Sequence, residues 1–339
     1  MPNSIAKIKQ LRKQEPSVEK LVKGILNGDK ASLARAITLV ESAKKNHSKK
    51  ANAIIEACLA HDKNSIRIGI TGVPGVGKST FIEALGIMLT KLDKKVAVLA
   101  VDPTSSITKG SVLGDKTRME LLAKDPNAFI RPSPSSQSLG GVARKTRETI
   151  ILCEAANYDV ILVETVGVGQ SETVVHGMVD FFLLLKLAGA GDELQGIKRG
   201  IMEMADGVVI NKADGANKNE ALKAKTEFTG ALHLYPAKEN KWHPKVLTCS
   251  ALHNIGISEV WDMITDYTNL AKDALSFEQN RIKQNQNWFI ETVNDSLYRD
   301  FYNSEAVKAN LDSLLLEIQE NKISPFYAAK KLLDLYESP

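Results

Sequence analysis

Apolar residues near the start of the chain recur at the spacing of one helix face. They form two stripes, made of Val18, Leu21, Val22 and Ile25 and of Leu33, Ala36, Ile37 and Val40. Gly28 separates the stripes, and Asp29 after it is a residue type that caps helix N-termini. The pattern predicts an N-terminal helical extension over residues 1–63.

The pattern then changes to short, nearly continuous apolar runs. They cover Ile66–Ile70, Val96–Val101, Val160–Val163, Phe181–Leu185, Val208–Ile210 and Val246–Cys249. Runs of this kind are typical of strands that are covered on both faces, and segments of helical length lie between them. The alternation predicts an α/β domain over residues 64–270, with a doubly wound, mainly parallel sheet.

Helical spacing returns in residues 271–339, which we interpret as a C-terminal helical arm. Its stripes consist of Phe289, Val293, Leu297 and Phe301 and of Leu311, Leu314, Leu315 and Ile318. Ser324 and Pro325 suit the N-cap and first position of a last helix. The apolar and aromatic residues of the arm pack either within the chain or against a second copy as a homodimer, and the pattern leaves both open.

Composition narrows the functional classes. The 339 residues are 43% hydrophobic and 25% charged, as in globular proteins. The net charge of +4 is spread without a long basic block, so we expect no nucleic-acid partner. The three cysteines form no Cys-x-x-Cys pair, which argues against a disulfide framework. With no signal-like start and no apolar run of about 20 residues, we expect no membrane association and a cytoplasmic protein.

The first apolar run leads into a segment of the form Gly-x-x-x-x-Gly-Lys-Ser, which ends at Ser79. An apolar-periodic helix follows, so the motif has the strand–loop–helix context of a phosphate-binding P-loop. Its backbone N–H groups can converge on phosphates, while Lys78 reaches the β and γ oxygens and the Ser79 hydroxyl binds Mg²⁺. The predicted phosphate-binding residues are Gly72, Val73, Pro74, Gly75, Val76, Gly77, Lys78, Ser79 and Thr80.

A second motif is suited to binding the base of the nucleotide. Asn211-Lys212-Ala213-Asp214 follows a buried run, at the strand end where open α/β sheets bind ligands. The Asp214 carboxylate can accept from both guanine N1–H and the 2-amino group, which adenine cannot satisfy, and the Lys212 stem can lie on the base. A backbone N–H after the last run can reach guanine O6. The predicted base-binding residues are Asn211, Lys212, Asp214, Ser250, Ala251 and Leu252, and the predicted ligands are GTP and GDP.

Further strand ends carry candidate metal-binding and catalytic residues. Asp102 and Glu164 each follow a run, and each either serves Mg²⁺ or merely caps its strand. Gly167 can offer its N–H to the γ-phosphate, which makes Lys78, Glu164 and Gly167 candidate catalytic residues for GTP hydrolysis. Val168 stands where Ras-like GTPases carry a water-orienting glutamine. We therefore expect slow unassisted turnover.

Long segments of the chain resemble the methylmalonyl-CoA mutase-associated GTPases, the MeaB/ArgK family of the signal-recognition/MinD/BioD class of P-loop GTPases. The resemblance extends through both helical extensions. The segments that carry it are residues 72–80, 101–106, 114–119, 139–146, 164–172 and 189–198. Matched blocks of this length are more specific than a P-loop alone.

The resemblance implies a homodimeric GTPase chaperone of a cobalamin-dependent acyl-CoA mutase, with methylmalonyl-CoA mutase the commonest client. It couples GTP hydrolysis to adenosylcobalamin loading and to protection or reactivation of the mutase. The resemblance also places Ser79, Asp102, Asp115 and Glu164 near Mg²⁺, and it makes Lys198 a mobile-loop lysine in partner-stimulated hydrolysis. Two alternatives remain, namely a GTP-regulated kinase linked to arginine and ornithine transport and a non-enzymatic scaffold.

Overall fold

The structure is a computed structural model that contains two compact units, Met1–Arg281 and Ile282–Pro339. Each unit is described by itself. The described residues are 16–42, 44–61, 64–101, 119–132, 139–165, 167, 171–189, 199–238 and 240–337.

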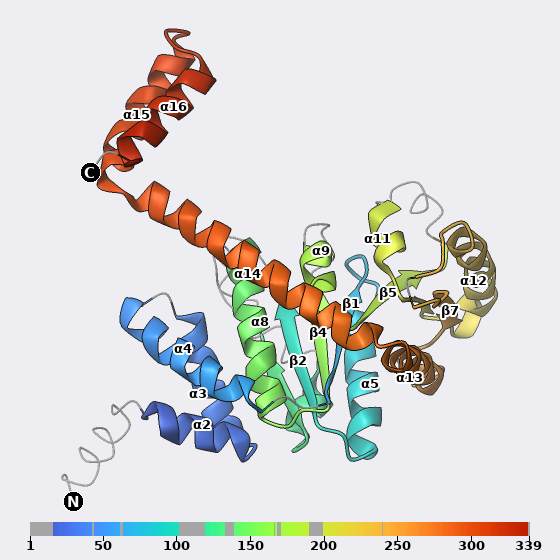
Figure 1. Cartoon of the computed structure of the whole chain (residues 1–339). Coiled ribbons are helices and arrows are strands. Elements are labelled where there is room, and N and C mark those ends of the chain that lie inside the picture. Colours follow the sequence, from blue (N-terminus) through green and yellow to red (C-terminus); the bar gives the residue numbers. More distant parts are fainter. Residues whose placement is uncertain are drawn as a thin grey trace, which may run out of the picture. The chain divides into compact units, whose positions relative to one another are not determined.

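The first unit is built on a parallel sheet (Figure 1). Within the described residues it has seven strands in the order β3-β2-β4-β1-β5-β6-β7, and each strand pairs in parallel with its neighbours. The expected doubly wound α/β architecture is thereby confirmed. The strands are β1 (Ile66–Thr71), β2 (Val96–Val101), β3 (Ala128–Arg131), β4 (Val160–Thr165), β5 (Phe181–Leu187), β6 (Gly207–Asn211) and β7 (Lys245–Thr248).

Six of these strands contain the predicted apolar runs, and β3 was not predicted. β3 is short, lies at the edge of the sheet and ends in Arg131. The Arg131 guanidinium forms an ion pair with Glu41, and its Nε donates to Glu41 Oε1 over 2.9 Å. β3 has only four residues, of which Ala128 alone is buried, so its sequence carries a weaker apolar signal.

Helices cover both faces of the sheet, as the nearly continuous apolar strands require. Along β5, Leu183 and Leu185 belong to the core that contains Phe81 and Met263, whereas Leu184 belongs to the core that contains Phe228. None of the described helices has both the length and the apolar content needed to cross a membrane. The helices around the sheet are α5 (Lys78–Lys91), α7 (Glu120–Lys124), α8 (Leu139–Ala155), α9 (Ser171–His176), α11 (Arg199–Met204), α12 (Lys218–Leu232) and α13 (Ile257–Asp273).

The predicted N-terminal extension forms the helices α2 (Val18–Leu26), α3 (Lys30–Glu41) and α4 (Lys45–Leu59). Asp29 caps α3 as predicted, because its carboxylate accepts from the N–H groups of Ala31 and Ser32 over 3.2 and 2.9 Å. All three helices contact α8, and α3 also reaches the edge strand β3 through the ion pair of Glu41 with Arg131. The extension therefore adds a further layer outside the nucleotide-binding fold.

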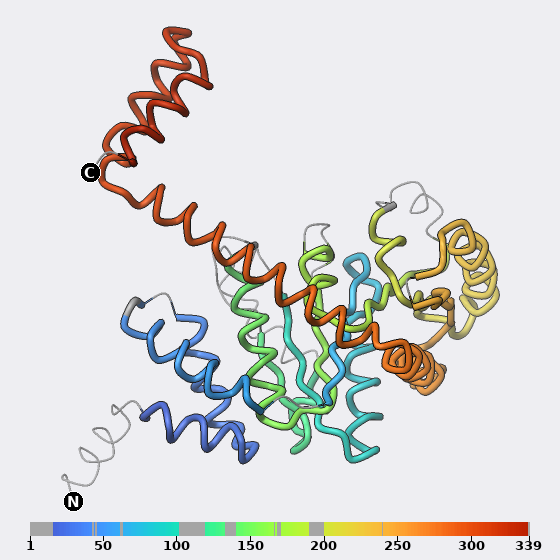
Figure 2. Tube along the Cα trace, viewed as in Figure 1, coloured from blue at the N-terminus to red at the C-terminus, as the bar shows by residue number. Residues whose placement is uncertain are grey.

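The second unit comprises most of α14 (Ser276–Asn303) together with α15 (Glu305–Gln319) and α16 (Pro325–Glu337). Figure 2 shows α15 and α16 running back along each other as a hairpin. Val307, Leu314, Ala328 and Leu332 form its small core. Ser324 caps α16 as predicted, accepting from Tyr327 N over 3.2 Å, with Pro325 at the first position.

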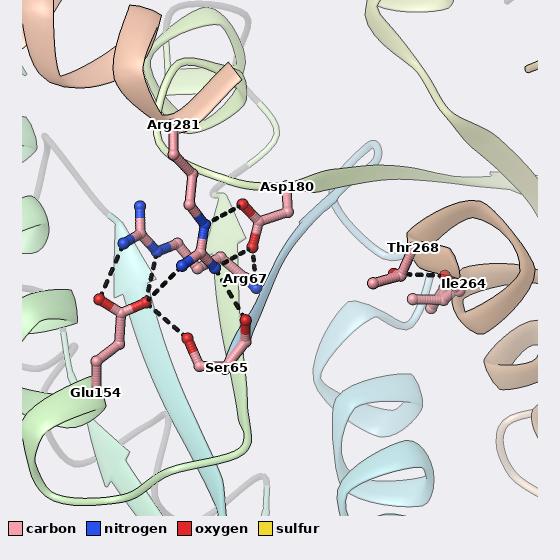
Figure 3. A network of polar contacts seen from close by, with 7 residues as sticks. All are labelled: Ser65, Arg67, Glu154, Asp180, Ile264, Thr268 and Arg281. Carbon is pink, nitrogen blue, oxygen red and sulfur yellow. Dashed lines mark hydrogen bonds and ion pairs between the residues drawn. The ribbon is translucent and has the colours of Figure 1, made fainter. Parts of the chain in front are cut away.

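A buried ionic network ties the start of α14 to the amino ends of the central strands (Figure 3). Arg67 in β1 donates through Nε and Nη2 to the Glu154 carboxylate over 2.8 and 2.9 Å. Arg281 donates through Nε and Nη2 to Asp180 over 2.8 and 2.7 Å. Ser65 joins the two pairs, because its hydroxyl donates to Glu154 and its carbonyl accepts from Arg281. Two guanidinium groups thus balance two carboxylates away from water.

Removing one charge from this network should destabilise the first unit. Arg281→Met takes away the cation of Asp180, and breaking a buried pair on one side costs about 3–5 kcal/mol. Arg299→Met, at an exposed position of the same helix, is the control and should stay within about 0.5 kcal/mol of the parent. Urea unfolding measures both. Equal midpoints for the two variants would show that the network contributes little.

Candidate functional site

The predicted nucleotide-binding segments come together at the carboxyl edge of the sheet. β1 leads into the segment from Gly72, β4 contains Glu164 near its end, and β6 ends at Asn211. β1 lies between β4 and β5, where the strand order changes direction along the sheet. Ligands of open α/β folds bind at such switch points.

The P-loop closes around its own lysine. Lys78 is the first residue of α5, and its Nζ donates to the carbonyls of Gly72 and Val73 over 2.7 and 3.4 Å. Gly77 before it has the left-handed φ of 96°, and a Cβ there would lie 2.7 Å from Asn211 Nδ2. Glycine at this position therefore lets the P-loop backbone approach the base-binding segment.

Lys78 is buried, and its surroundings shift the pKa of its ammonium group in opposite directions. Burial lowers the pKa of its ammonium group, while the carboxylates of Glu164 and then Glu172 act to raise it. Glu172 was not predicted as a site residue. It lies on α9 within the family-like segment 164–172, but nothing in the local pattern assigns it a role. Its charge acts in the same direction on the Lys78 pKa as that of Glu164.

Two of the residues predicted to serve Mg²⁺, Ser79 and Glu164, are in contact with each other. The Ser79 hydroxyl donates to Glu164 Oε1 over 3.2 Å. A hydroxyl and a carboxylate are the hard oxygen ligands that Mg²⁺ prefers, usually completed by phosphates and water. Asp102 and Asp115 lie outside the described residues, within which no group of three or more histidine, cysteine or acidic side chains is placed to hold a metal.

Gly167 lies directly against the P-loop. A Cβ at this left-handed position, with φ of 89°, would come within 2.2 Å of the Gly72 carbonyl oxygen and 3.1 Å of Lys78 Nζ. Behind it, the Thr165 hydroxyl donates to the Thr71 hydroxyl over 2.9 Å and ties the ends of β4 and β1 together. The backbone of Gly167 therefore lies beside the start of the P-loop and its lysine. Val168 and Lys198 lie outside the described residues.

Asn211 links the two motifs. Its Nδ2 donates to the Val76 carbonyl over 2.8 Å, and its Oδ1 accepts from Ala251 N over 3.1 Å. Asn211 therefore connects the P-loop to the segment after β7 through hydrogen bonds on both sides of its amide. Because the Ala251 N–H is engaged in this way and the Ser250 N–H donates to the Ile255 carbonyl over 2.9 Å, we expect the Leu252 N–H to face guanine O6.

The two charged residues of the base-binding motif are also held in place. Lys212 has a left-handed φ of 58°, which costs a residue with a side chain about 1–2 kcal/mol, and its Nζ donates to the Gly75 carbonyl over 2.8 Å. The Ser250 hydroxyl donates to the Asp214 carboxylate. Strain of this kind is concentrated at functional sites. The arrangement can fix a base against the Lys212 stem and in front of Asp214.

Comparisons with known proteins identify the family of the chain. The family model described as "Methylmalonyl Co-A mutase-associated GTPase MeaB" matches residues 33–306. A probable GTPase of Mycobacterium tuberculosis is 47% identical over 321 residues, covering 95% of this chain and 96% of the relative. The GTPase ArgK of Escherichia coli is 43% identical over 324 residues, covering 96% and 98%.

Two further comparisons extend the relationship. The mitochondrial methylmalonic aciduria type A homolog of mouse is 41% identical over 336 residues, covering 96% of this chain and 81% of the relative. A solved crystal structure of an LAO/AO transport system kinase superimposes with a TM-score of 0.77 at 38% identity, covering 96% of this chain and 99% of the other. The chain is therefore a GTPase that belongs to the methylmalonyl-CoA mutase-associated GTPase family.

Proposed function

We propose that this GTPase is a chaperone of a cobalamin-dependent acyl-CoA mutase, with methylmalonyl-CoA mutase the first candidate client. The observation that carries the proposal is the match of residues 33–306 to a family described by its association with that mutase. The chaperone uses GTP binding and hydrolysis to control adenosylcobalamin loading and to protect or reactivate the mutase.

In this proposal each site residue binds a different part of the nucleotide or its metal ion. The P-loop N–H groups and Lys78 hold the phosphates, and Asp214 selects guanine. The Ser79 hydroxyl and the Glu164 carboxylate hold Mg²⁺, which neutralises phosphate charge when it is bound. The Gly167 N–H donates to the γ-phosphate. Their contacts at one edge of the sheet support these assignments.

The identity of the client is tested by a pull-down from cells and by a hydrolysis assay with the purified mutase. The chain should retain the mutase in a pull-down from cells grown with cobalamin, and the isolated mutase should accelerate its GTP hydrolysis. A second preparation with the P-loop variant Lys78→Ala is the control and should not hydrolyse GTP with or without mutase. A mutase that neither binds nor changes turnover would refute the chaperone role and leave the GTPase assignment intact.

A homodimer is the second part of the proposal. In the second unit, α14 exposes a series of large apolar side chains at about i, i+4 spacing, including Phe289, Val293 and Leu297 at 66, 40 and 60%. An apolar stripe of this size is unusual on a monomer surface and is suited to a symmetric contact with the same stripe of another copy. Phe301, the next residue of the same i+4 series, packs against the small core of α15 and α16.

We expect the intact chain to scatter light as a dimer at micromolar concentration. Phe289→Lys combined with Leu297→Lys should produce a monomer, because charges would have to be buried in the contact. Leu234→Lys, at an 86% exposed apolar position of the first unit, is the matched control and should remain a dimer. A monomeric parent protein would exclude the proposed contact.

A second candidate function comes from the name of the solved relative, an LAO/AO transport system kinase. A kinase transfers the γ-phosphate to a protein, whereas a GTPase releases it as inorganic phosphate. Incubation with γ-labelled GTP, with and without a periplasmic arginine- or ornithine-binding protein, separates the two. Label that appears only in inorganic phosphate would exclude the kinase function.

A further inference from the structure

The segment after the base-binding motif contains an asparagine whose amide faces back along the chain. Asn217 is the N-cap residue of α12, and an asparagine at such a position usually accepts from the first N–H groups of its helix. Within the part of the chain that the structure describes, the Asn217 side chain makes no such cap. Its Nδ2 atom donates instead to the Lys212 carbonyl over 2.8 Å. The side chain thus contacts the base-binding motif rather than its own helix.

Asn217 holds the backbone of this motif at two positions. A carbonyl oxygen can only accept, so the amide nitrogen of Asn217 is the atom that must face Lys212. The backbone N–H of Asn217 donates to the Asp214 carbonyl over 3.0 Å. One residue outside the motif therefore contacts both of its charged residues through their backbone.

Lys212 is the residue of the motif whose conformation needs support. Its φ of 58° lies in the left-handed region, which a residue with a Cβ atom rarely adopts. In this conformation its Nζ donates to the Gly75 carbonyl of the P-loop over 2.8 Å. Without the hydrogen bond from Asn217, the Lys212 backbone is free to relax toward negative φ. Such a change would redirect the aliphatic stem that we propose to lie on the base.

The same arrangement leaves the Asp214 carboxylate available. Asp214 precedes the 3₁₀ turn Gly215–Asn217, at a position where an aspartate commonly uses its carboxylate as a cap. The turn bonds to the Asp214 backbone carbonyl instead, and among the described residues no capping hydrogen bond reaches the carboxylate. The carboxylate accepts from the Ser250 hydroxyl. Its acceptors are therefore not used up by the helix that follows.

We infer that Asn217 is a positioning residue for nucleotide binding, which holds Lys212 in the left-handed conformation from which its stem packs on the base. Asn217 acts through Lys212 rather than through the nucleotide, so the inference rests on the proposed base contact of Lys212. A stem that packs on the face of a purine does not depend on the hydrogen bonds at the edge of the base. The contribution of Asn217 is therefore the same for guanine and hypoxanthine nucleotides and absent for a ligand without a base.

Three ligands test the inference. Competition titrations against a fluorescent GDP analogue, calibrated for each variant at equal Mg²⁺, give the Kd for GTP, inosine triphosphate and inorganic tripolyphosphate. Asn217→Ala should weaken both nucleotides by the same factor of about threefold to tenfold, as expected for the loss of one hydrogen bond, and leave tripolyphosphate unchanged. Asn219→Ala, at an exposed asparagine in the first turn of α12, is the matched control and should change none of the three.

A second variant separates nucleotide binding from stability. Asn217→Asp keeps the size of the side chain, removes the donor and leaves a good capping residue at the start of α12. It should weaken GTP at least as much as Asn217→Ala, while its urea unfolding midpoint stays at or above that of the parent. Parent-like GTP affinity in both variants would overturn the inference, and so would an equal loss of affinity for tripolyphosphate, which would indicate a disturbed P-loop.

Lys212→Gly shows whether Asn217 acts through Lys212. Glycine adopts the left-handed conformation without strain and has no stem, so Asn217→Ala should cause no further loss of GTP affinity in this background. A loss of the same size in both backgrounds would overturn the inference, because Asn217 would then act elsewhere. Parent-like GTP binding by Lys212→Gly alone would refute the proposed base contact of Lys212, and the inference with it. The two failures are therefore distinguished by different variants.

Discussion

Asp214→Asn should cost this GTPase its preference for guanine. The parent carboxylate can accept from guanine N1–H and from the 2-amino group, and an asparagine amide presents a donor where the second acceptor is needed. A site built on paired hydrogen bonds rejects a mismatched ligand by about 10⁴-fold. Xanthosine triphosphate has a carbonyl in place of the 2-amino group, so the variant should prefer it to GTP.

Competition titrations with GTP, ATP and xanthosine triphosphate measure this preference. Ser250→Ala removes the hydroxyl that donates to Asp214 and should weaken GTP by about tenfold or less, because it loosens the carboxylate without removing it. Asp262→Asn, at an exposed aspartate on α13, is the control and should keep the parent preference. If Asp214→Asn also keeps it, the base is read elsewhere.

The fold was largely predictable because buried parallel strands leave a strong signal. Five or six consecutive apolar residues, as in Val96–Val101, have few other structures available when helical segments flank them. β3 gave no such signal, since four residues at an edge need little apolar character and Arg131 pairs with Glu41 instead. Signals of this kind weaken where a strand is short and only partly buried.

The motifs of the site were predictable singly, whereas the contacts between them were not. The sequence indicated that Asn211 belongs to a base-binding motif, but its contacts with Val76 and Ala251 depend on residues 135 and 40 positions away. The same holds for the network that joins Arg67 to Glu154 across 87 positions. Arg67 interrupts an apolar run, and nothing in the run itself identifies its partner. Only the tertiary fold supplies such partners.

Lys198→Ala should separate basal from mutase-stimulated hydrolysis. The chain carries Val168 where a water-orienting glutamine stands in Ras-like GTPases, so we expect basal turnover to be slow. A cation supplied to the transferring phosphoryl group on partner binding accelerates hydrolysis by about 10³-fold or more in other GTPases. We propose that Lys198, which lies outside the described residues, supplies this charge when the mutase binds.

The variant should therefore bind GTP and hydrolyse it slowly like the parent, while the stimulated rate falls by about 10³-fold, since a cation aimed at the developing phosphoryl charge acts mainly in the transition state. Single-turnover hydrolysis with and without saturating mutase gives both rates, and co-purification shows whether the complex still forms. Lys218→Ala, an exposed lysine at the start of α12, is the control and should keep full stimulation. Full stimulation of Lys198→Ala would reject the mechanism, and loss of GTP binding without mutase would assign Lys198 a structural role instead.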